Sequence, residues 1–407
     1  MARHPAHGKT REQIGERAPQ RFRGRPGVLA AVALIAAAAI ILAAGIILFV
    51  PGQGPHTRPS SSSSSPPSPA AALAALLGQG VPDTAPGYWG KTVPALKAAA
   101  DGADDASFRA LGALLVKDGF AGAVIDLGRE MTGHWYNWSE GRCPHAEPRC
   151  FIFAWRHAVD AMRSVPGQHF RFLWTVFPGT AAAIDAWPGA AYVDLVGTDI
   201  YDWYGGPDNT YPHTASGQLD HTAKWQQILT QPGGLDWLAR LSKLTGKPVA
   251  IPEWGLDFHS FGGHDDPAFI TRMLAWLHAH HAIGVYWAVD HVGSDPAVPP
   301  GPLLAGLGAD AQTPAGVNDF GLLLGGRLQY AEAFLAEYQL PSDSSAQPVL
   351  APWQHAGYQL ILDVPLVPLT VPSYNGPPEP GPKPYLLAEY PDALAAFHQG
   401  VTGARRS

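Results

Sequence analysis

Two repeating patterns of hydrophobic and polar positions alternate between about residue 80 and residue 340. Apolar runs of four to seven residues are typical of strands buried on both faces, and the segments between them show the periodicity of amphipathic helices. The predicted strands are 123–127, 171–176, 192–198, 248–251 and 284–288. The predicted helices are 104–117, 152–164, 235–245, 267–281 and 328–338. This order predicts an α/β domain built on a parallel sheet.

Polar residues and a proline stand where the predicted strands end: Glu130, Pro178, Asp199, Glu253 and Asp290. In a (β/α)8 barrel, the carboxyl ends of the strands carry the active site. A doubly wound sheet binds ligands at the same edge, but no glycine-rich phosphate loop follows any of these strands. The pattern therefore favours a (β/α)8 TIM-barrel-like domain.

An uncharged apolar run of 23 residues, 28–50, precedes this domain and predicts one transmembrane helix. Basic residues are concentrated before it, so residues 1–27 are expected in the cytoplasm and the rest of the chain outside. A cleaved signal peptide is the alternative, although no small-residue cleavage site follows the run. The localisation predicted on this basis is a single-pass protein of the cell membrane with an extracytoplasmic domain.

Composition divides the remainder of the chain. Residues 51–70 are rich in Ser and Pro and predict a disordered linker, 71–340 form the barrel domain, and 341–407 form a Pro-rich tail with one candidate strand at 357–364. The chain has 27 basic and 34 acidic residues, a net charge of −7, and no basic stripe after residue 60. Nucleic acid is therefore not an expected partner, and we expect no cofactor.

The two cysteines, Cys143 and Cys150, bracket the segment PHAEPR. A local disulfide is the expectation if the domain is exported. Two free thiols fit a cytosolic protein instead. A zinc site with His145 and Glu147 would require further ligands, so no metal site is predicted.

Two glutamates follow predicted strands in segments rich in Trp and Gly. Glu130 lies in GREMTGHWYNWS (128–139), and Glu253 lies in KPVAIPEWGLD (247–257). Cleavage of a glycosidic bond needs two such carboxyl groups, one as acid and one as nucleophile or base. The pair therefore indicates glycoside hydrolysis.

Four segments in order resemble glycoside hydrolase family 26, the β-mannanase family, over about residues 100–340. They are the two glutamate segments together with DLVGTDIYDWYGG (194–206) and VYWAVDH (285–291). The resemblance implies a retaining (β/α)8 hydrolase whose acid/base follows the fourth strand and whose nucleophile follows the seventh. Any one of these segments alone would be a weak signal.

The resemblance also implies roles for individual residues. Glu130 matches the general acid/base, Glu253 the nucleophile, and Tyr201 a tyrosine that hydrogen-bonds the nucleophile. Trp135 matches a sugar-contacting tryptophan, and Trp287 matches a platform under the sugar at the cleavage point.

Three further residues are candidate substrate contacts, each with a structural alternative. Trp138 either stacks on a sugar or packs in the core. His134 either contacts substrate hydroxyls or faces water. Asp199 either contacts substrate or orients loop backbone as a buried carboxylate.

The chain departs from the family pattern in two places. Arg129 stands where the family has a histidine before the acid/base, and its fixed charge would lower the pKa of an adjacent carboxyl if it pointed into the site. Only about 50 residues separate the linker from the strand before Glu130, so the first barrel strands are expected to be missing. The barrel is then incomplete, or a partner or the strand at 357–364 fills the gap, or a truncated domain has been joined to an anchor.

The predicted function is a membrane-anchored glycoside hydrolase that cleaves β-linked polysaccharide, mannan-type above others, by a retaining mechanism. The alternative is a catalytically inactive cell-surface glycan-binding protein with a partial barrel. Both hypotheses make polysaccharide the partner. An envelope protein without a sugar ligand would leave the paired glutamates unexplained.

Overall fold

The computed structural model describes part of the chain, and this part belongs to one compact unit, Pro66–Ser407. The described residues are 67–77, 93–133, 136–143, 149–179, 186–203, 211–257, 262–286, 313–315, 317–318, 328–336, 339–369 and 391–404.

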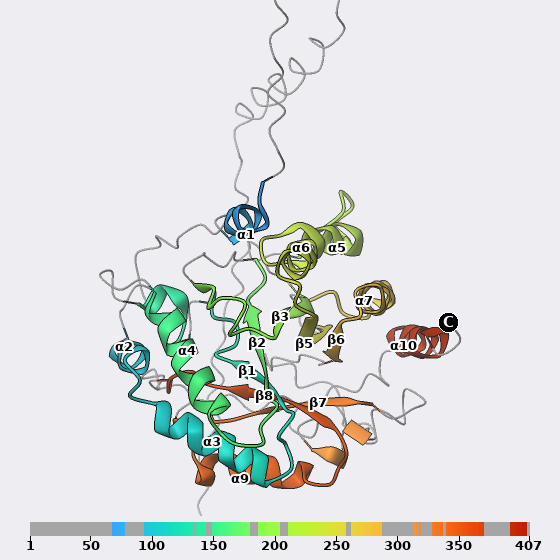
Figure 1. Ribbon diagram of the computed structural model, residues 1–407. Helices are drawn as coiled ribbons and strands as arrows, with labels where there is room; N and C mark the ends of the chain where they lie inside the picture. Colours follow the sequence, from blue (N-terminus) through green and yellow to red (C-terminus); the bar gives the residue numbers. More distant parts are fainter. Residues whose placement is uncertain are drawn as a thin grey trace, which may run out of the picture. The chain divides into compact units, whose positions relative to one another are not determined.

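Within these residues, eight strands form one sheet in which every pairing is parallel (Figure 1). They are β1 (Val124–Leu127), β2 (Arg171–Val176), β3 (Leu195–Thr198), β4 (Ile200–Asp202), β5 (Val249–Leu256), β6 (Ile283–Tyr286), β7 (Tyr330–Phe334) and β8 (Gln359–Val364). β3 and β4 are consecutive pieces along β5, and β6 pairs with β5 as well. The parallel sheet predicted from the short apolar runs is confirmed.

The C-terminal strands complete the sheet on the side where the first strands were expected to be missing. β8 pairs with β1, for example Val124 with Ile361, and β7 pairs with β8. The two ends of the curled sheet, β6 and β7, approach each other. The strand that lies beside the Glu130 strand on this side of the sheet thus comes from the end of the chain. Among the alternatives for the gap, the tail strand fills it, and the fold is that of a partial (β/α)8 barrel.

Helices lie around the outside of this sheet (Figure 1). They are α1 (Pro69–Leu77), α2 (Pro94–Ala100), α3 (Asp105–Lys117), α4 (Cys150–Arg163), α5 (His221–Thr230), α6 (Leu235–Thr245), α7 (Pro267–Ala279), α9 (Asp343–Leu350) and α10 (Pro391–Ala404), with short 3₁₀ turns η2 (Glu140–Arg142) and η4 (Ala351–Trp353). α4 packs against α2 and α3, α6 against α1, and α7 against α10. Most of the apolar core lies between the strands and these helices.

A second, smaller core fills the concave side of the sheet. It consists of five fully buried residues from five strands: Val124, Leu173, Leu195, Ala250 and Ile361. Strand residues alternate between the two faces of a sheet, so polar side chains two positions further along these strands point to the same concave side. This arrangement places carboxyl groups above an apolar floor at the carboxyl ends of the strands.

Several elements differ from the expectation. Residues 328–338 were expected to be a helix, but Tyr330–Phe334 is strand β7, because pairing with β8 outweighs the helix preference of an Ala- and Glu-rich segment. The tail at 341–407 contributes β8, α9 and α10 to the compact unit. Helix α1 begins at Pro69, inside the stretch expected to be a disordered linker.

The membrane prediction is not supported. No helix in the described part of the chain is long and apolar enough to cross a bilayer. This finding contradicts the predicted single-pass localisation and its membrane anchor, which are not carried further. The run at 28–50 lies outside the described residues.

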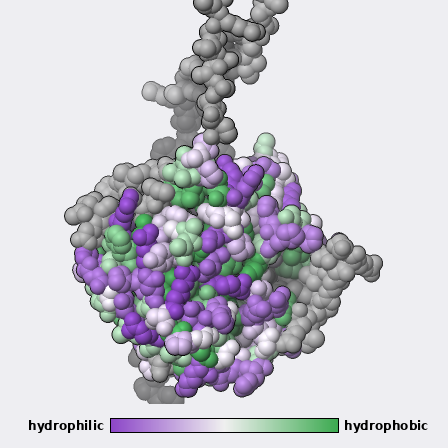
Figure 2. Space-filling model, viewed as in Figure 1, coloured by the Kyte–Doolittle hydropathy of each residue, from purple (hydrophilic) through white to green (hydrophobic). Residues whose placement is uncertain are grey.

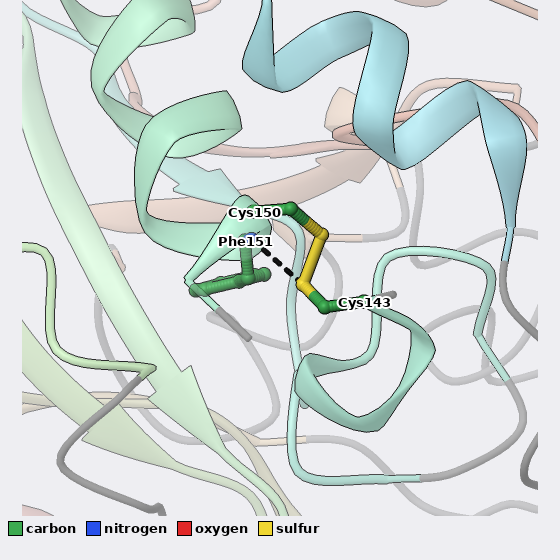
Figure 3. Close-up of a disulfide and its surroundings, with 3 residues drawn as sticks. All are labelled: Cys143, Cys150 and Phe151. Atoms are coloured by element: carbon green, nitrogen blue, oxygen red, sulfur yellow. Dashed lines mark hydrogen bonds between the residues drawn. A yellow bond between two sulfur atoms is a disulfide. The ribbon is translucent and has the colours of Figure 1, made fainter. Parts of the chain in front are cut away.

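The disulfide expected between the two cysteines is present (Figure 3). It joins Cys143, directly after η2, to Cys150, the first residue of α4, and the backbone N–H of Phe151 donates to Sγ of Cys143 at 3.1 Å. Figure 2 shows one face of the molecule, on which hydrophilic residues are interspersed with smaller hydrophobic areas. Among the described residues, Phe153 is the large hydrophobic side chain that is exposed, at 48%.

Candidate active site

The loop that carries Glu130 leaves β1 through two residues with left-handed backbone. Gly128 has φ +57° and lies so close to Trp138 and Leu366 that a Cβ would come within 3.1–3.2 Å of their side chains. Glu130 has φ +48°, which costs a residue other than glycine about 1 kcal/mol or more. Such strain persists only where the surroundings impose it, and it occurs most often at functional sites.

Side-chain hydrogen bonds fix this loop. Nε1 of Trp138 donates to the carbonyl oxygen of Arg129 at 2.9 Å, and the Thr132 hydroxyl accepts from the Phe177 N–H at 2.8 Å, just beyond β2. Nδ2 of Asn137 donates to the carbonyl oxygen of Pro368, beyond β8, at 2.7 Å. Trp138 is 1% exposed. Its predicted sugar contact is therefore replaced by a packing role, because a sugar cannot reach a ring that is already covered.

Glu253 lies in β5, where the pairing with β6 shifts register between Ile251 and Trp254. The Tyr201 hydroxyl donates to Oε2 of Glu253 at 2.7 Å, the contact that the resemblance implies. Oδ1 of Asp199 accepts from the backbone N–H of Glu253 at 3.3 Å. Asp199 is fully buried, so the structure gives it the alternative role of a carboxylate that orients backbone.

Arg129 points toward the nucleophile candidate. Its Nη1 lies 3.0 Å from Oε1 of Glu253 and 3.0 Å from Oδ2 of Asp363. The guanidinium also lies over two rings, 4.8 Å from the centroid of Phe334 and 5.5 Å from that of Tyr136. Since Arg has a permanent charge and a planar fork of donors, it holds two carboxylates at once.

Burial raises the pKa of Glu130 to about 8, and the negative charge of Glu253 adds to this effect. The charge of Arg129 and a hydrogen bond with Asp199 act in the opposite direction without cancelling it. Glu130 therefore keeps its proton at neutral pH. The sequence raised the concern that Arg129 would make Glu130 too acidic, and in the structure burial outweighs that effect.

Other carboxyl groups surround this pair. Asp126 accepts from the Thr175 hydroxyl at 2.9 Å, and burial raises the pKa of Asp126 and of Asp199 well above the usual range. β7 and β8 supply Glu332 and Asp363, both nearly fully buried. Sequence reasoning missed these two residues. The Asp at the end of the strand predicted at 357–364 was a usable signal, whereas Glu332 was hidden in a predicted helix.

Possible ligand atoms of Glu253, Glu332 and Asp363 lie within 4.8 Å of one another, as a metal site requires. The guanidinium of Arg129 already occupies this cluster, however, with contacts to two of its members. A fixed cation at that point opposes the binding of a second one. We therefore assign Glu253 and Asp363 to Arg129 rather than to a metal ion.

Three predicted contacts, His134, Trp135 and Trp287, lie outside the described residues, as does Asp290. Asp202 lies near Tyr201 in sequence but does not join the site. Because side chains alternate along β4, Tyr201 faces Glu253 and Asp202 faces the helices instead. Burial and the charge of Asp266 raise the pKa of Asp202 to about 7.

A protonated carboxyl group and a hydrogen-bonded carboxylate thus share the carboxyl edge of a curled parallel sheet. Two carboxyl groups in such different settings at this edge of the sheet are what cleavage of a glycosidic bond requires. Residues 123–219 match the model of Glycosyl hydrolase family 26, and the chain contains a domain similar to that family. The resemblance noted in the sequence is thereby confirmed over the segments 128–139 and 194–206.

Solved structures of mannanases are also similar to the chain. A family 26 β-mannanase from Bacteroides ovatus is 19% identical over 41% of this chain and 42% of that one, with a TM-score of 0.30. The catalytic domain of an endo-β-1,4-mannanase from Bacillus sp. JAMB-750 is 20% identical over 39% of each chain, with a TM-score of 0.27. The chain thus spans less than half the length of these mannanases. No curated protein matches it.

Proposed function

We propose that this protein is a retaining glycoside hydrolase that cleaves β-linked polysaccharide of the mannan type. The observation that carries the proposal is the difference between the surroundings of two glutamates. Glu130 is kept protonated by its surroundings, and Glu253 receives a hydroxyl donor and a guanidinium. When two neighbouring carboxyl groups lie in such different environments, the protonated group can serve as the acid and the ionised group as the nucleophile.

In the first step, a carboxylate oxygen of Glu253 attacks the anomeric carbon of the bound sugar. The glycosidic bond breaks as Glu130 donates its proton to the leaving oxygen, and a glycosyl ester to Glu253 forms. Tyr201 and Arg129 hold the carboxylate of Glu253 in one orientation, and this restricts it to a productive approach.

In the second step, Glu130 is a carboxylate and takes a proton from water. The oxygen of that water attacks the anomeric carbon, the ester bond breaks, and Glu253 is restored as a carboxylate. Two inversions at the anomeric carbon give net retention. The raised pKa of Glu130 suits both steps, because the group has to exchange a proton near neutral pH.

The substrate class follows from the resemblance of the four segments to the β-mannanase family and is part of the proposal. Purified chain is incubated with linear β-mannan, galactomannan, mixed-linkage β-glucan and cellulose, and new reducing ends are counted. We expect release from a mannan, and loss of about 10³-fold or more in Glu253→Ala. Asp194→Asn is the matched control, since Asp194 forms an ion pair with Arg163 outside the site.

The ion pair between Arg129 and Glu253 also favours a second candidate, a glycan-binding protein without turnover, because a neutralised carboxylate is a weaker nucleophile. The same panel separates the two. If the chain binds a mannan but releases no new reducing ends at the same protein concentration, the glycan-binding candidate is supported. Neither turnover nor binding contradicts both candidates.

A further inference from the structure

Three residues on the opposite face of β4 form a cluster that the proposed hydrolysis does not use. Asp202 ends β4, His221 begins α5, and Asp266 is the N-cap of α7. Possible ligand atoms of the three lie within 4.8 Å of one another. The cluster therefore joins three elements between the sheet and the helices, behind the wall that carries Tyr201.

The contacts within the cluster leave one carboxylate oxygen without a hydrogen-bond partner among the described residues. The Tyr211 hydroxyl donates to Oδ1 of Asp202 at 2.8 Å, and Nδ1 of His221 lies 2.9 Å from that hydroxyl and 3.0 Å from Oδ2 of Asp266. Oδ2 of Asp202 has no hydrogen-bond partner among the described residues, although the side chain is only 1% exposed. A buried polar atom of this kind costs about 1–3 kcal/mol unless an ion or water satisfies it.

The backbone of Gly263 packs closely against that oxygen. A Cβ on Gly263 would lie 1.8 Å from Oδ2 of Asp202 and 2.8 Å from the Tyr211 hydroxyl, so only glycine fits there. The N–H of Gly263 donates to the carbonyl oxygen of Asp202 at 2.9 Å, which fixes this approach. His221 is half-buried, with 34% of its side chain exposed, and provides a path from solvent.

Charge favours a cation at this position. The negative charges of Asp266 and Asp257 and the positive charge of Lys224 act on the carboxyl group of Asp202, so carboxyl groups outnumber the ammonium group beside it. Removing carboxylates from water is costly unless opposite charge compensates them. A divalent ion supplies that charge, whereas a hydrogen-bond network alone leaves Oδ2 of Asp202 buried without a donor.

We propose that Asp202, His221 and Asp266 form a binding site for a divalent transition-metal ion of the zinc class. An imidazole nitrogen with two carboxylate oxygens suits zinc, while calcium and magnesium prefer oxygen donors throughout. Tyr211 lies beside the ligands and orients Asp202 through its hydroxyl. The ion would fasten the end of β4 to the starts of α5 and α7.

The test uses the full chain with zinc alone. After loading and dialysis, the metal content per chain is measured by mass spectrometry, and thermal unfolding is followed with and without zinc. We expect about one equivalent retained and a melting temperature higher by about 5 °C at a zinc concentration of about 100 times Kd. Asp202→Asn and His221→Gln should each lose that equivalent and most of the shift.

The matched control is His157→Gln, which removes a His–Asp pair at 3.1 Å on the α3–α4 side of the fold that has no third ligand in the described residues. This variant should retain zinc as the unmodified chain does. His221→Gln keeps the test valid if Asp202→Asn unfolds, because His221 is the more exposed ligand. No retained zinc, or equal retention in all variants, overturns the proposal. Failure of this site leaves the proposed hydrolysis untouched, since the two are tested by different readouts.

Discussion

Replacing Arg129 by Met removes the cation that two carboxylates share while keeping most of the side-chain volume. Arg129 lies 3.0 Å from both Glu253 and Asp363, and the exposed fractions of the three side chains are 16%, 17% and 6%. Removal of one partner from a buried pair costs about 3–5 kcal/mol, because the remaining charges stay buried without compensation. Since water still reaches Glu253, we expect the lower end, a loss of about 3 kcal/mol in the free energy of unfolding at pH 7.

The matched control is Arg163→Met. Arg163 is 2.9 Å from Asp194 and lies 5.1 Å from the Phe172 ring, so it has the same two kinds of contact as Arg129. Its ion pair is about 30% exposed on both sides, and such pairs contribute about 1 kcal/mol or less. Urea unfolding of both variants, followed by tryptophan fluorescence, gives the two losses on one scale.

The sign of the pH dependence adds a second readout. The loss in Arg129→Met should shrink toward acidic pH, where the carboxyl groups take up protons and no longer repel each other. Equal losses below about 1 kcal/mol in both variants, or a loss in Arg129→Met that is independent of pH, would refute the assignment of a buried, shared ion pair.

Three further predictions follow from the same structure. In the unmodified chain kcat/KM should fall as pH rises through about 8, because Glu130 has to be protonated. Glu130→Gln, assayed on an activated aryl glycoside, should lack that decline. A decline that persists in the variant would assign the pH dependence to another group. Cys143→Ala with Cys150→Ala should lose about 2–3 kcal/mol in urea unfolding, and an unchanged midpoint contradicts this. A chain truncated after residue 340 loses β8 and should fail to unfold cooperatively; a cooperative transition shows that β1 does not need that strand.

The local pattern of hydrophobic and polar residues predicted several strands and helices closely. The ranges 171–176 and 235–245 are β2 and α6 as predicted, and 104–117 differs from α3 by one residue. These segments combine a clear period with strong burial, so tertiary structure agrees with local preference. Helix α5 was missed, because its sequence HTAKWQQILT has a weak apolar face.

The arrangement of the sheet could not be predicted in the same way. Which strand lies beside β1 depends on contacts between residues more than 200 positions apart, such as Val124 with Ile361, and no local pattern records them. The same distance in sequence explains why Asp363 was missed as a partner of Arg129. The glutamate pair was found because each residue lies in a recognisable segment at the end of its own strand.

In the proposed mechanism Glu130 and Glu253 carry out a double displacement. Its most direct test is proton NMR of the first-formed product anomer when the chain cleaves a β-mannan oligosaccharide, recorded before mutarotation. A double displacement on a β-linked substrate releases the β-anomer first, and Glu253→Ala should form no product under the same conditions. An α-anomer formed first, or unchanged turnover in Glu253→Ala, would rule out a double displacement through Glu253.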